Sequence, residues 1–258
     1  MDFKNDIMLK LYVLYAGDII CRDSSQLNED ISEKVEIPLA NPIFLIQHPK
    51  GWLLWDAGLS DELVNQEDGI EAWIFHLSMK KTVLNQLKEI GLDPSDIDYF
   101  AFSHVHNDHT GNANYFKSAK LIMQEKEYNI AFDPNKKPSN YSDYSELRNS
   151  EIIKLNGDYD LFGDGTIQFI STPGHTAGHQ SLLLKLEKTG PIIISGDIAY
   201  YEEQYQNKGI PTFNNSKKES LASLEKIKKL IKNKNAQLWI QHDPVNFETL
   251  KLSPSYYE

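Results

Sequence analysis

The sequence of 258 residues contains a single cysteine, Cys21. One cysteine excludes an intrachain disulfide, and any metal site must rely on histidine and carboxylate side chains. No stretch approaches the roughly 20 consecutive apolar residues that span a bilayer, so we expect no membrane association. The N-terminal leader contains two aspartates and two lysines, so it carries no excess of positive charge. This pattern disfavours a secretory signal, and we expect a cytoplasmic protein.

Positive charge is also scarce. Lysine and arginine total 26 against 37 acidic residues, which gives a formal net charge of -11. The phosphate-neutralising surface of a nucleic-acid binder is not evident in such a balance, so we expect no nucleic-acid partner. The composition is otherwise ordinary for a globular protein, and the length permits one sizeable core. We expect a single domain over residues 1–258.

Strand and helix patterns alternate along the chain. Apolar residues alternate from Leu9 to Tyr15, which predicts a first strand. Two apolar runs flank residues 49–51 and predict a hairpin. Residues 83–90 carry apolar side chains at helical spacing, with Gly91 as a stop. The stretch 60–79 is irregular, and the proline-bearing stretch 133–146 is expected to be an exposed insertion.

The second half of the chain repeats the pattern of the first. WLLWDAG and IIISGD are each a predicted hairpin strand that ends in an aspartate beside a glycine, Asp56 and Asp197. A lysine-rich amphipathic helix beginning near Ser216 and a last strand that ends in His242 follow. The fold class is therefore α/β with two similar β-rich halves. Strand patterns alone permit either a doubly wound sheet or a four-layer αββα sandwich.

Six of the eight histidines fall in three short blocks, and each block follows an apolar, β-rich run. Functional sites in α/β folds collect outside the carboxyl ends of strands, where loops are free to converge. Three such loops are therefore expected to meet in one cleft. The blocks contain His104, His106 and His109, then His175 and His179, and finally His242.

The first block, S-H-x-H-x-D-H-x-G, predicts a pair of metal ions. Four ligand-type residues lie within six positions and cannot all face one point on a regular helix or strand. A loop lets His104 and His106 turn one way while Asp108 and His109 turn the other, which suits two cations roughly 3.5–4 Å apart. Asp197 follows three isoleucines and is well placed to be shared by both ions.

Other candidate residues receive simpler interpretations. The isolated His48 and His76 are assigned no role. His179 is expected to orient a ligand by hydrogen bonding rather than to bind metal. Cys21 is expected in the core or a loop. Asp56 either orients a ligand loop or caps the end of its strand.

Together these motifs resemble the metallo-β-lactamase superfamily, whose order they share: the first block, TPGHTAGH, SGD and a C-terminal strand ending in histidine. Within it, the chain is most similar to the quorum-quenching N-acyl homoserine lactone hydrolases, or lactonases. GDIAY places Tyr200 three residues after Asp197, where those lactonases have a catalytic tyrosine. DLFGDGT and the terminal HDPVNFETLKLSPSYYE are also similar to theirs.

The resemblance implies a four-layer αββα sandwich and two divalent metal ions, most simply zinc. One metal would be bound by His104, His106 and His175, the other by Asp108, His109 and His242, and Asp197 would bridge them. An Asp bridge without cysteine departs from the β-lactamases that use a cysteine ligand. Asn107 stands where a lactonase relative carries an aromatic residue, which leaves the acyl-chain preference open.

The resemblance also implies a reaction. A bridging hydroxide would attack the carbonyl of a small-molecule lactone and open its ring. The Tyr200 hydroxyl would stabilise the oxyanion, and Asp108 would pass a proton to the leaving alkoxide. The acyl tail needs an apolar groove, for which Trp73, Phe75, Met79 and Phe213 are candidates, although each also suits a buried structural role.

Two alternatives stay open. A glyoxalase II-like thioester hydrolase shares the ligands but commonly carries an added C-terminal helical region, whereas one obvious helix and one strand follow Asp197 here. The other alternative is a non-catalytic metal-binding scaffold on the same fold. Loss of ligands would be the mark of such a scaffold, and none of the seven is missing. The acidic balance disfavours a phosphodiesterase. A monomer or a homodimer is expected.

Overall fold

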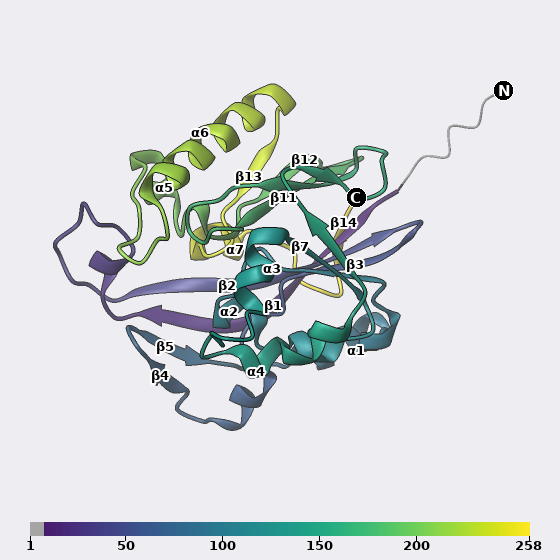
Figure 1. Cartoon of the computed structure of the whole chain (residues 1–258), viewed down its shortest axis with the longest axis horizontal. Coiled ribbons are helices and arrows are strands. Elements are labelled where there is room, and N and C mark those ends of the chain that lie inside the picture. The colour runs from purple at the N-terminus through teal and green to yellow at the C-terminus, as the bar shows by residue number, and fades with distance from the viewer. Residues whose placement is uncertain (1–7) are drawn as a thin grey trace.

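The computed structural model describes residues 8–258 (Figure 1). Residues 1–7, which hold most of the leader, lie outside the described residues, so the expectation of no secretory signal stays a prediction. Among residues 8–258, no helix combines the length and the apolar character needed to cross a membrane.

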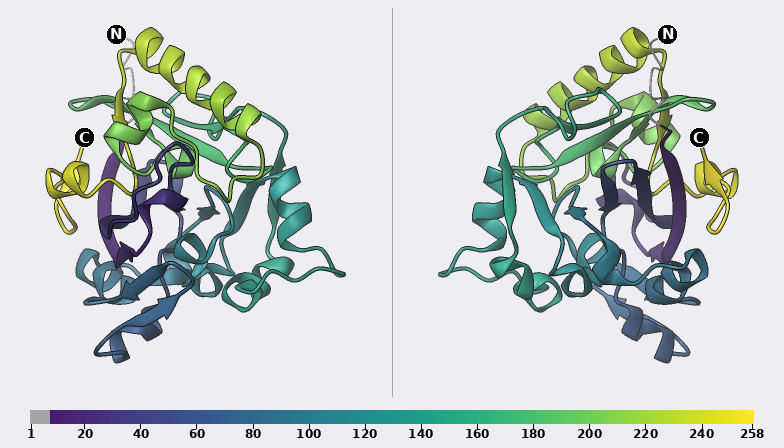
Figure 2. Two further views of the ribbon diagram at one scale, coloured as in Figure 1. Left: turned by 90° about the vertical axis from the view of Figure 1, so that its left-hand side faces the viewer. Right: turned by 90° about the vertical axis from the view of Figure 1, so that its right-hand side faces the viewer.

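Two β-sheets form the centre of the molecule (Figures 1 and 2). The larger sheet contains β1 (Lys10–Cys21), β2 (Ile37–His48), β3 (Gly51–Trp55), β4 (Ile70–Ala72), β5 (Phe75–Ser78), β6 (Tyr99–Ala101), β7 (Lys120–Gln124), β8 (Ile152–Leu155) and β14 (Tyr256–Tyr257). Its order is β4-β5-β1-β2-β3-β6-β7-β8, with β14 also paired to β1.

The smaller sheet and the helices complete the fold. The sheet contains β9 (Tyr159–Asp160), β10 (Ile167–Ser171), β11 (Gln180–Leu186), β12 (Gly190–Ile194) and β13 (Gln237–Trp239), in the order β13-β12-β11-β10-β9. The α-helices are α1 (Val83–Ile90), α2 (Asn107–Thr110), α3 (Glu125–Ala131), α4 (Tyr141–Tyr144), α5 (Glu202–Asn207), α6 (Lys217–Lys234) and α7 (Pro244–Glu248).

Alternation along the strands creates the layers. Leu53 and Trp55 on β3 join the core between the two sheets, whereas Leu54 faces the outer core with α1 and α3. On β12, Ile193 points outward and packs with Leu224 of α6, because successive strand residues face opposite sides. Figure 2 shows α6 across the outer side of the smaller sheet. The predicted four-layer αββα sandwich is therefore confirmed.

The two halves of the chain share one local topology. β2 and β3 form an antiparallel hairpin and β6 runs parallel to β3. In the same way, β11 and β12 form a hairpin and β13 runs parallel to β12. Asp56 and Asp197 follow the equivalent strands β3 and β12, while His104 and His242 lie just beyond β6 and β13. The similarity of WLLWDAG and IIISGD thus reflects equivalent places beside the site.

The local predictions for the first hundred residues are largely confirmed. The first strand is present and continues to Cys21, with a register shift between Tyr15 and Asp18. The hairpin and α1 also form as expected. Thr82 caps α1 by accepting from an amide of its first turn, and Gly91 ends it in a left-handed conformation with φ 83°.

Two segments are more ordered than their sequences indicate. The stretch predicted as irregular contains the β4–β5 hairpin, which forms because β5 pairs with residues 18–21 of β1. The stretch expected to be an exposed insertion contains α4, and Tyr144 is fully buried there against Phe102 and Phe132. In both cases tertiary pairing decides the structure of a weakly patterned segment.

Candidate metal centre

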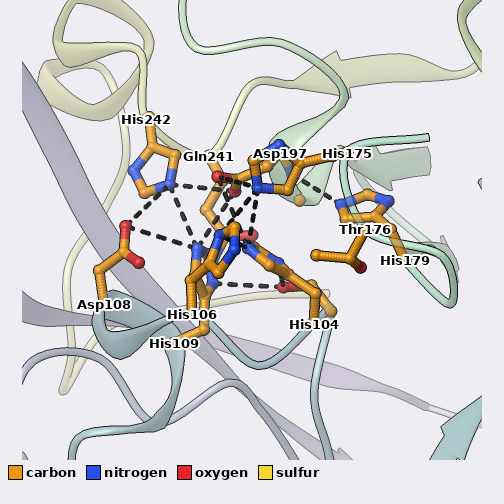
Figure 3. A network of polar contacts seen from close by, with 12 residues as sticks. His104, His106, Asp108, His109, His175, Thr176, His179, Asp197, Gln241 and His242 are labelled. Carbon is orange, nitrogen blue, oxygen red and sulfur yellow. Dashed lines mark hydrogen bonds and ion pairs between the residues drawn. The ribbon is translucent and has the colours of Figure 1, made fainter. Parts of the chain in front are cut away.

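Seven predicted ligands from distant segments lie together where loops leave the two sheets (Figure 3). Their donor atoms form two groups, in each of which all atoms lie within 4.8 Å of one another. We call His104, His106 and His175 the first cluster. Asp108, His109, Asp197 and His242 are the second cluster.

Three ring nitrogens meet in the first cluster. His104 Nε2 lies 2.9 Å from His106 Nδ1, and His175 Nε2 lies 3.1 Å and 3.0 Å from those two atoms. His175 Nδ1 donates to the amide oxygen of Asn214 at 3.0 Å, so its Nε2 carries a lone pair. Burial is the main cause that lowers the pKa of all three histidines, which favours neutral rings with free lone pairs.

The second cluster joins two ring nitrogens to two carboxylates. His109 Nδ1 donates to Asp56 at 2.9 Å and His242 Nδ1 donates to the carbonyl of Ala40 at 2.7 Å. The two Nε2 atoms, which are left to face the cluster, lie 3.3 Å apart. Each lies 3.1 Å from Asp197 Oδ1 and 3.6 Å from Asp108 Oδ2.

The carboxylates give the second cluster a different charge balance from the first. Burial alone would lower the pKa of His109 and His242, but the negative charges of Asp108 and Asp197 raise both. The same imidazoles hold the pKa of Asp197 well below its usual range, despite its burial. The second cluster therefore attracts positive charge strongly.

Asp197 spans the two clusters. Its Oδ1 faces His109 and His242, whereas its Oδ2 lies 3.5 Å from His175 and 3.8 Å from His104. Nitrogens that share a tetrahedral zinc at about 2.0–2.1 Å lie about 3.3 Å apart, close to the spacing in each cluster. Each cluster gathers ring nitrogens with almost no other buried donor or acceptor between them, and Asp197 faces both clusters. This arrangement fits two cations better than a hydrogen-bonded core.

His179 makes the orienting hydrogen bond expected of it. Its Nδ1 donates to Thr172 O at 3.0 Å, and its Nε2 accepts from the backbone N–H of Asp197 at 2.8 Å. Burial lowers the pKa of His179 to about 4, so the ring stays neutral and can accept. Gly196 allows this approach, because a Cβ there would lie 2.5 Å from the His179 ring and its φ is 57°.

Asp56 orients a ligand loop, one of its two expected roles. It is fully buried and adopts a left-handed conformation with φ 63°, which is rare outside glycine. Its carboxylate accepts from Ser103 N at 2.6 Å, from His109 Nδ1 and from the Gln241 amide at 2.9 Å. Gln241 and Ser103 were not predicted, although each directly precedes a predicted ligand in the sequence.

The first histidine block differs in one respect from the expected loop. Asp108 and His109 lie on α2, a single helical turn for which His106 is the N-cap residue. The turn begins after His106, which belongs to the first cluster, and the two ligands on the turn belong to the second. Gly111 then packs on the loop of residues 58–60, where a Cβ would lie 2.2 Å from Ser60 N.

Tyr200 lies beside the second cluster at the base of a cleft of about 430 Å³. Its ring stacks on His242 with centroids 5.3 Å apart and an interplanar angle of 13°. Burial, followed by the charges of Asp197 and Asp108, raises its pKa well above the ordinary value of 10. The phenol is therefore a stable hydrogen-bond donor next to the clusters.

The cleft has an aromatic wall and a polar wall. Trp73 is 69% exposed and packs edge-on against Phe75 and Phe213, with centroids 6.0 Å and 5.4 Å away. Polar residues also line the cleft, including Asn107 and two that were not predicted, Ser139 and Asn140. Nothing in the sequence marked Ser139 and Asn140 as cleft residues, because they belong to the stretch that was expected to be an exposed insertion.

Four further residues lie outside the cleft. Met79 is buried in the core, as one of its two interpretations expected, and so is Cys21. His48 pairs with Asp164 and His76 with Glu71.

Residues 37–230 match the family model of the metallo-beta-lactamase superfamily. "N-acyl homoserine lactonase AttM" of Azorhizobium caulinodans is 32% identical, with 97% of this chain and 99% of that relative covered. "N-acyl homoserine lactonase AiiA" of Bacillus thuringiensis subsp. kurstaki is 27% identical, with 96% and 98% covered. A solved N-acyl homoserine lactone hydrolase with the product N-hexanoyl-L-homoserine at its catalytic metal centre has 26% identity and a TM-score of 0.83, with 97% and 99% covered.

The chain therefore belongs to the metallo-beta-lactamase superfamily, and the predicted resemblance is confirmed. Within that superfamily it is similar to N-acyl homoserine lactonases over nearly its whole length.

Proposed function

We propose that this protein is a metal-dependent hydrolase that opens the lactone ring of N-acyl homoserine lactones. Support comes from one arrangement above all: two clusters of imidazole and carboxylate donors meet at a cleft that also holds a protonated tyrosine. The full-length similarity to lactonases agrees with this activity.

The seven donor residues have the role of holding two cations. His104, His106 and His175 would bind one cation, Asp108, His109 and His242 would bind the other, and Asp197 would contact both. When bound, the cations supply a Lewis acid and lower the pKa of a water molecule from about 15.7 toward 7. Zinc suits this imidazole and carboxylate set. Its identity and the bridging hydroxide expected from the sequence stay predictions.

Two residues act on the substrate in this proposal. Tyr200 donates its hydroxyl proton in a hydrogen bond to the carbonyl oxygen as negative charge develops there, a role that needs the phenol to stay protonated. Asp108 is only partly buried and borders the cleft, so its carboxylate can accept the proton that the attacking water gives up and pass it to the alkoxide that leaves when the ring opens.

The shape of the cleft suits a polar ring joined to an apolar tail. The lactone ring would lie at the base, near Asp108 and Tyr200. The acyl chain would run along the aromatic wall formed by Trp73, Phe75 and Phe213. Cytoplasmic location and a monomeric or homodimeric state stay predictions from the sequence.

Ring-opening assays decide between this function and its alternatives. The purified protein is given acyl homoserine lactones and, separately, S-lactoylglutathione, before and after chelation. Lactone turnover that chelation abolishes and zinc restores supports the proposal. Thioester turnover alone would favour the glyoxalase II-like activity, and bound metal with neither activity would favour the scaffold.

A further inference from the structure

Glu127 is a buried carboxylate that the proposed reaction does not use. It lies on α3 and is only 2% exposed. Among residues 8–258, no lysine, arginine or histidine lies within ion-pair distance of it. Burial raises its pKa, and hydrogen bonds oppose that rise. A buried carboxylate without a cationic partner is costly, so its retention calls for a specific contact that compensates.

The contacts of Glu127 connect two segments that carry ligands. Its Oε1 accepts from Val105 N at 3.1 Å. Its Oε2 accepts from Thr176 Oγ1 at 2.8 Å and from Gly178 N at 2.9 Å. Val105 lies between His104 and His106, and Thr176 directly follows His175. One carboxylate thus ties together the two loops that supply the entire first cluster.

The second of these loops also packs directly on α3. A Cβ at Gly178 would lie 2.4 Å from Glu127 N and 2.6 Å from Glu127 Cβ. The loop can therefore approach the carboxylate closely enough for two hydrogen bonds only because residue 178 is a glycine.

The second cluster is held by different groups. Asp56 orients His109, the carbonyl of Ala40 orients His242, and Asn41 donates to the carbonyl of Asp108 at 3.1 Å. None of these three contacts involves Glu127. Asp56 also accepts from Ser103 N beside His104, whereas the hydrogen bonds of Glu127 reach only the segments that carry the first cluster.

We infer that Glu127 is a positioning residue that fixes the spacing of the loops bearing His104, His106 and His175, and so sets the affinity of the first cluster alone for its cation. The inference rests on the proposed two-cation site. Outer partners of metal ligands typically contribute about 10–100-fold to affinity, so a loss of that size is expected at one site when Glu127 is removed.

The test measures two zinc affinities in the full-length protein. Apoprotein is titrated with zinc in competition with a chromogenic chelator, for wild type, Glu127→Ala and Glu127→Gln. His175→Ala identifies which of the two constants belongs to the first cluster. Asp61→Asn is the matched control, because Asp61 is another buried carboxylate that accepts two backbone amides, and these belong to Val83 and Leu84 of α1 rather than to a segment that carries ligands.

Glu127→Ala is expected to weaken the first-cluster constant by about 10–100-fold and to leave the second unchanged. Glu127→Gln should weaken the same constant less, because its single carbonyl oxygen can serve only one of the two loops. Asp61→Asn should change neither constant. Absorption spectra of the cobalt-loaded proteins give a second readout, and only the Glu127 variants should alter the bands of the nitrogen-rich site.

Equal weakening of both constants, or of neither, would overturn the inference. If Glu127→Ala does not fold, the same criterion applies to Glu127→Gln. Lactone turnover by the wild type distinguishes a failure of this inference from a failure of the proposed function. If the wild type binds two zinc ions and opens lactones, but the Glu127 variants do not weaken the first-cluster constant selectively, only the positioning role is refuted. A wild type that binds fewer than two zinc ions refutes the two-cation site as well.

Discussion

Replacement of Tyr200 by phenylalanine isolates one hydroxyl group in the proposed reaction. Phenylalanine retains the ring that stacks on His242 and the packing of a residue that is only 4% exposed. The change therefore removes a hydrogen-bond donor while leaving the aromatic contact intact. Cation binding should be unaffected, because Tyr200 is not among the proposed ligands.

The expected magnitude follows from the setting of that hydroxyl. A donor aimed at a developing oxyanion typically contributes about 2.7–4 kcal/mol, or about 10²–10³ in turnover. Burial and the charges of Asp197 and Asp108 keep Tyr200 protonated, since its pKa lies well above 10. Its titration should thus produce no loss of activity between neutral pH and pH 10.

Lactone ring opening releases a carboxylic acid, so a pH-indicator assay follows the reaction directly. Wild type and Tyr200→Phe are compared at equal metal content, with kcat and KM measured separately. We expect a fall of two to three decades in kcat. A change of less than about threefold at unchanged metal content would exclude the oxyanion role, given the usual contribution of such donors.

Three further predictions concern the framework. Gly196→Ala should weaken zinc binding at both clusters, because a Cβ would displace His179 from the Asp197 amide; unchanged zinc titrations would contradict this. Burial lowers the pKa of His48 below 6.5, so the unfolded state takes up the proton first and the free energy of unfolding should fall as pH drops below about 6.5. Urea unfolding at pH 7 and pH 5 should show that the free energy of unfolding falls less for His48→Asn than for the wild type; equal falls in the two proteins would refute this. Chelation should lower the thermal unfolding midpoint, and zinc should restore it, because the cations bind the native state; an unchanged midpoint would argue against resident cations.

The predicted ligands could be found from sequence because their signal is local. His104, His106, Asp108 and His109 lie within six positions, a density that core histidines do not produce. Asp197 and His242 follow apolar strands, and the carboxyl ends of strands are where loops meet. The four layers needed the family resemblance as well, because the continuous apolar runs of β3 and β12 are buried on both faces and equally permit a doubly wound sheet.

The supporting groups could not be predicted, because their roles depend on tertiary contacts. Glu127 lies in a segment with no distinctive pattern, and although Gln241 directly precedes His242, each becomes important only through a partner far away in the sequence. Asn140 contributes to the cleft because its amide donates to Val105 O and Thr110 Oγ1. The β4–β5 hairpin likewise depends on the edge of β1 rather than on its own sequence.

Anomalous diffraction from zinc-loaded crystals at the zinc edge tests the two-cation centre most directly. We predict two anomalous peaks about 3.5–4 Å apart, one among His104, His106 and His175 and one among Asp108, His109 and His242, with Asp197 in contact with both. A single peak, or peaks away from these side chains, would contradict the account.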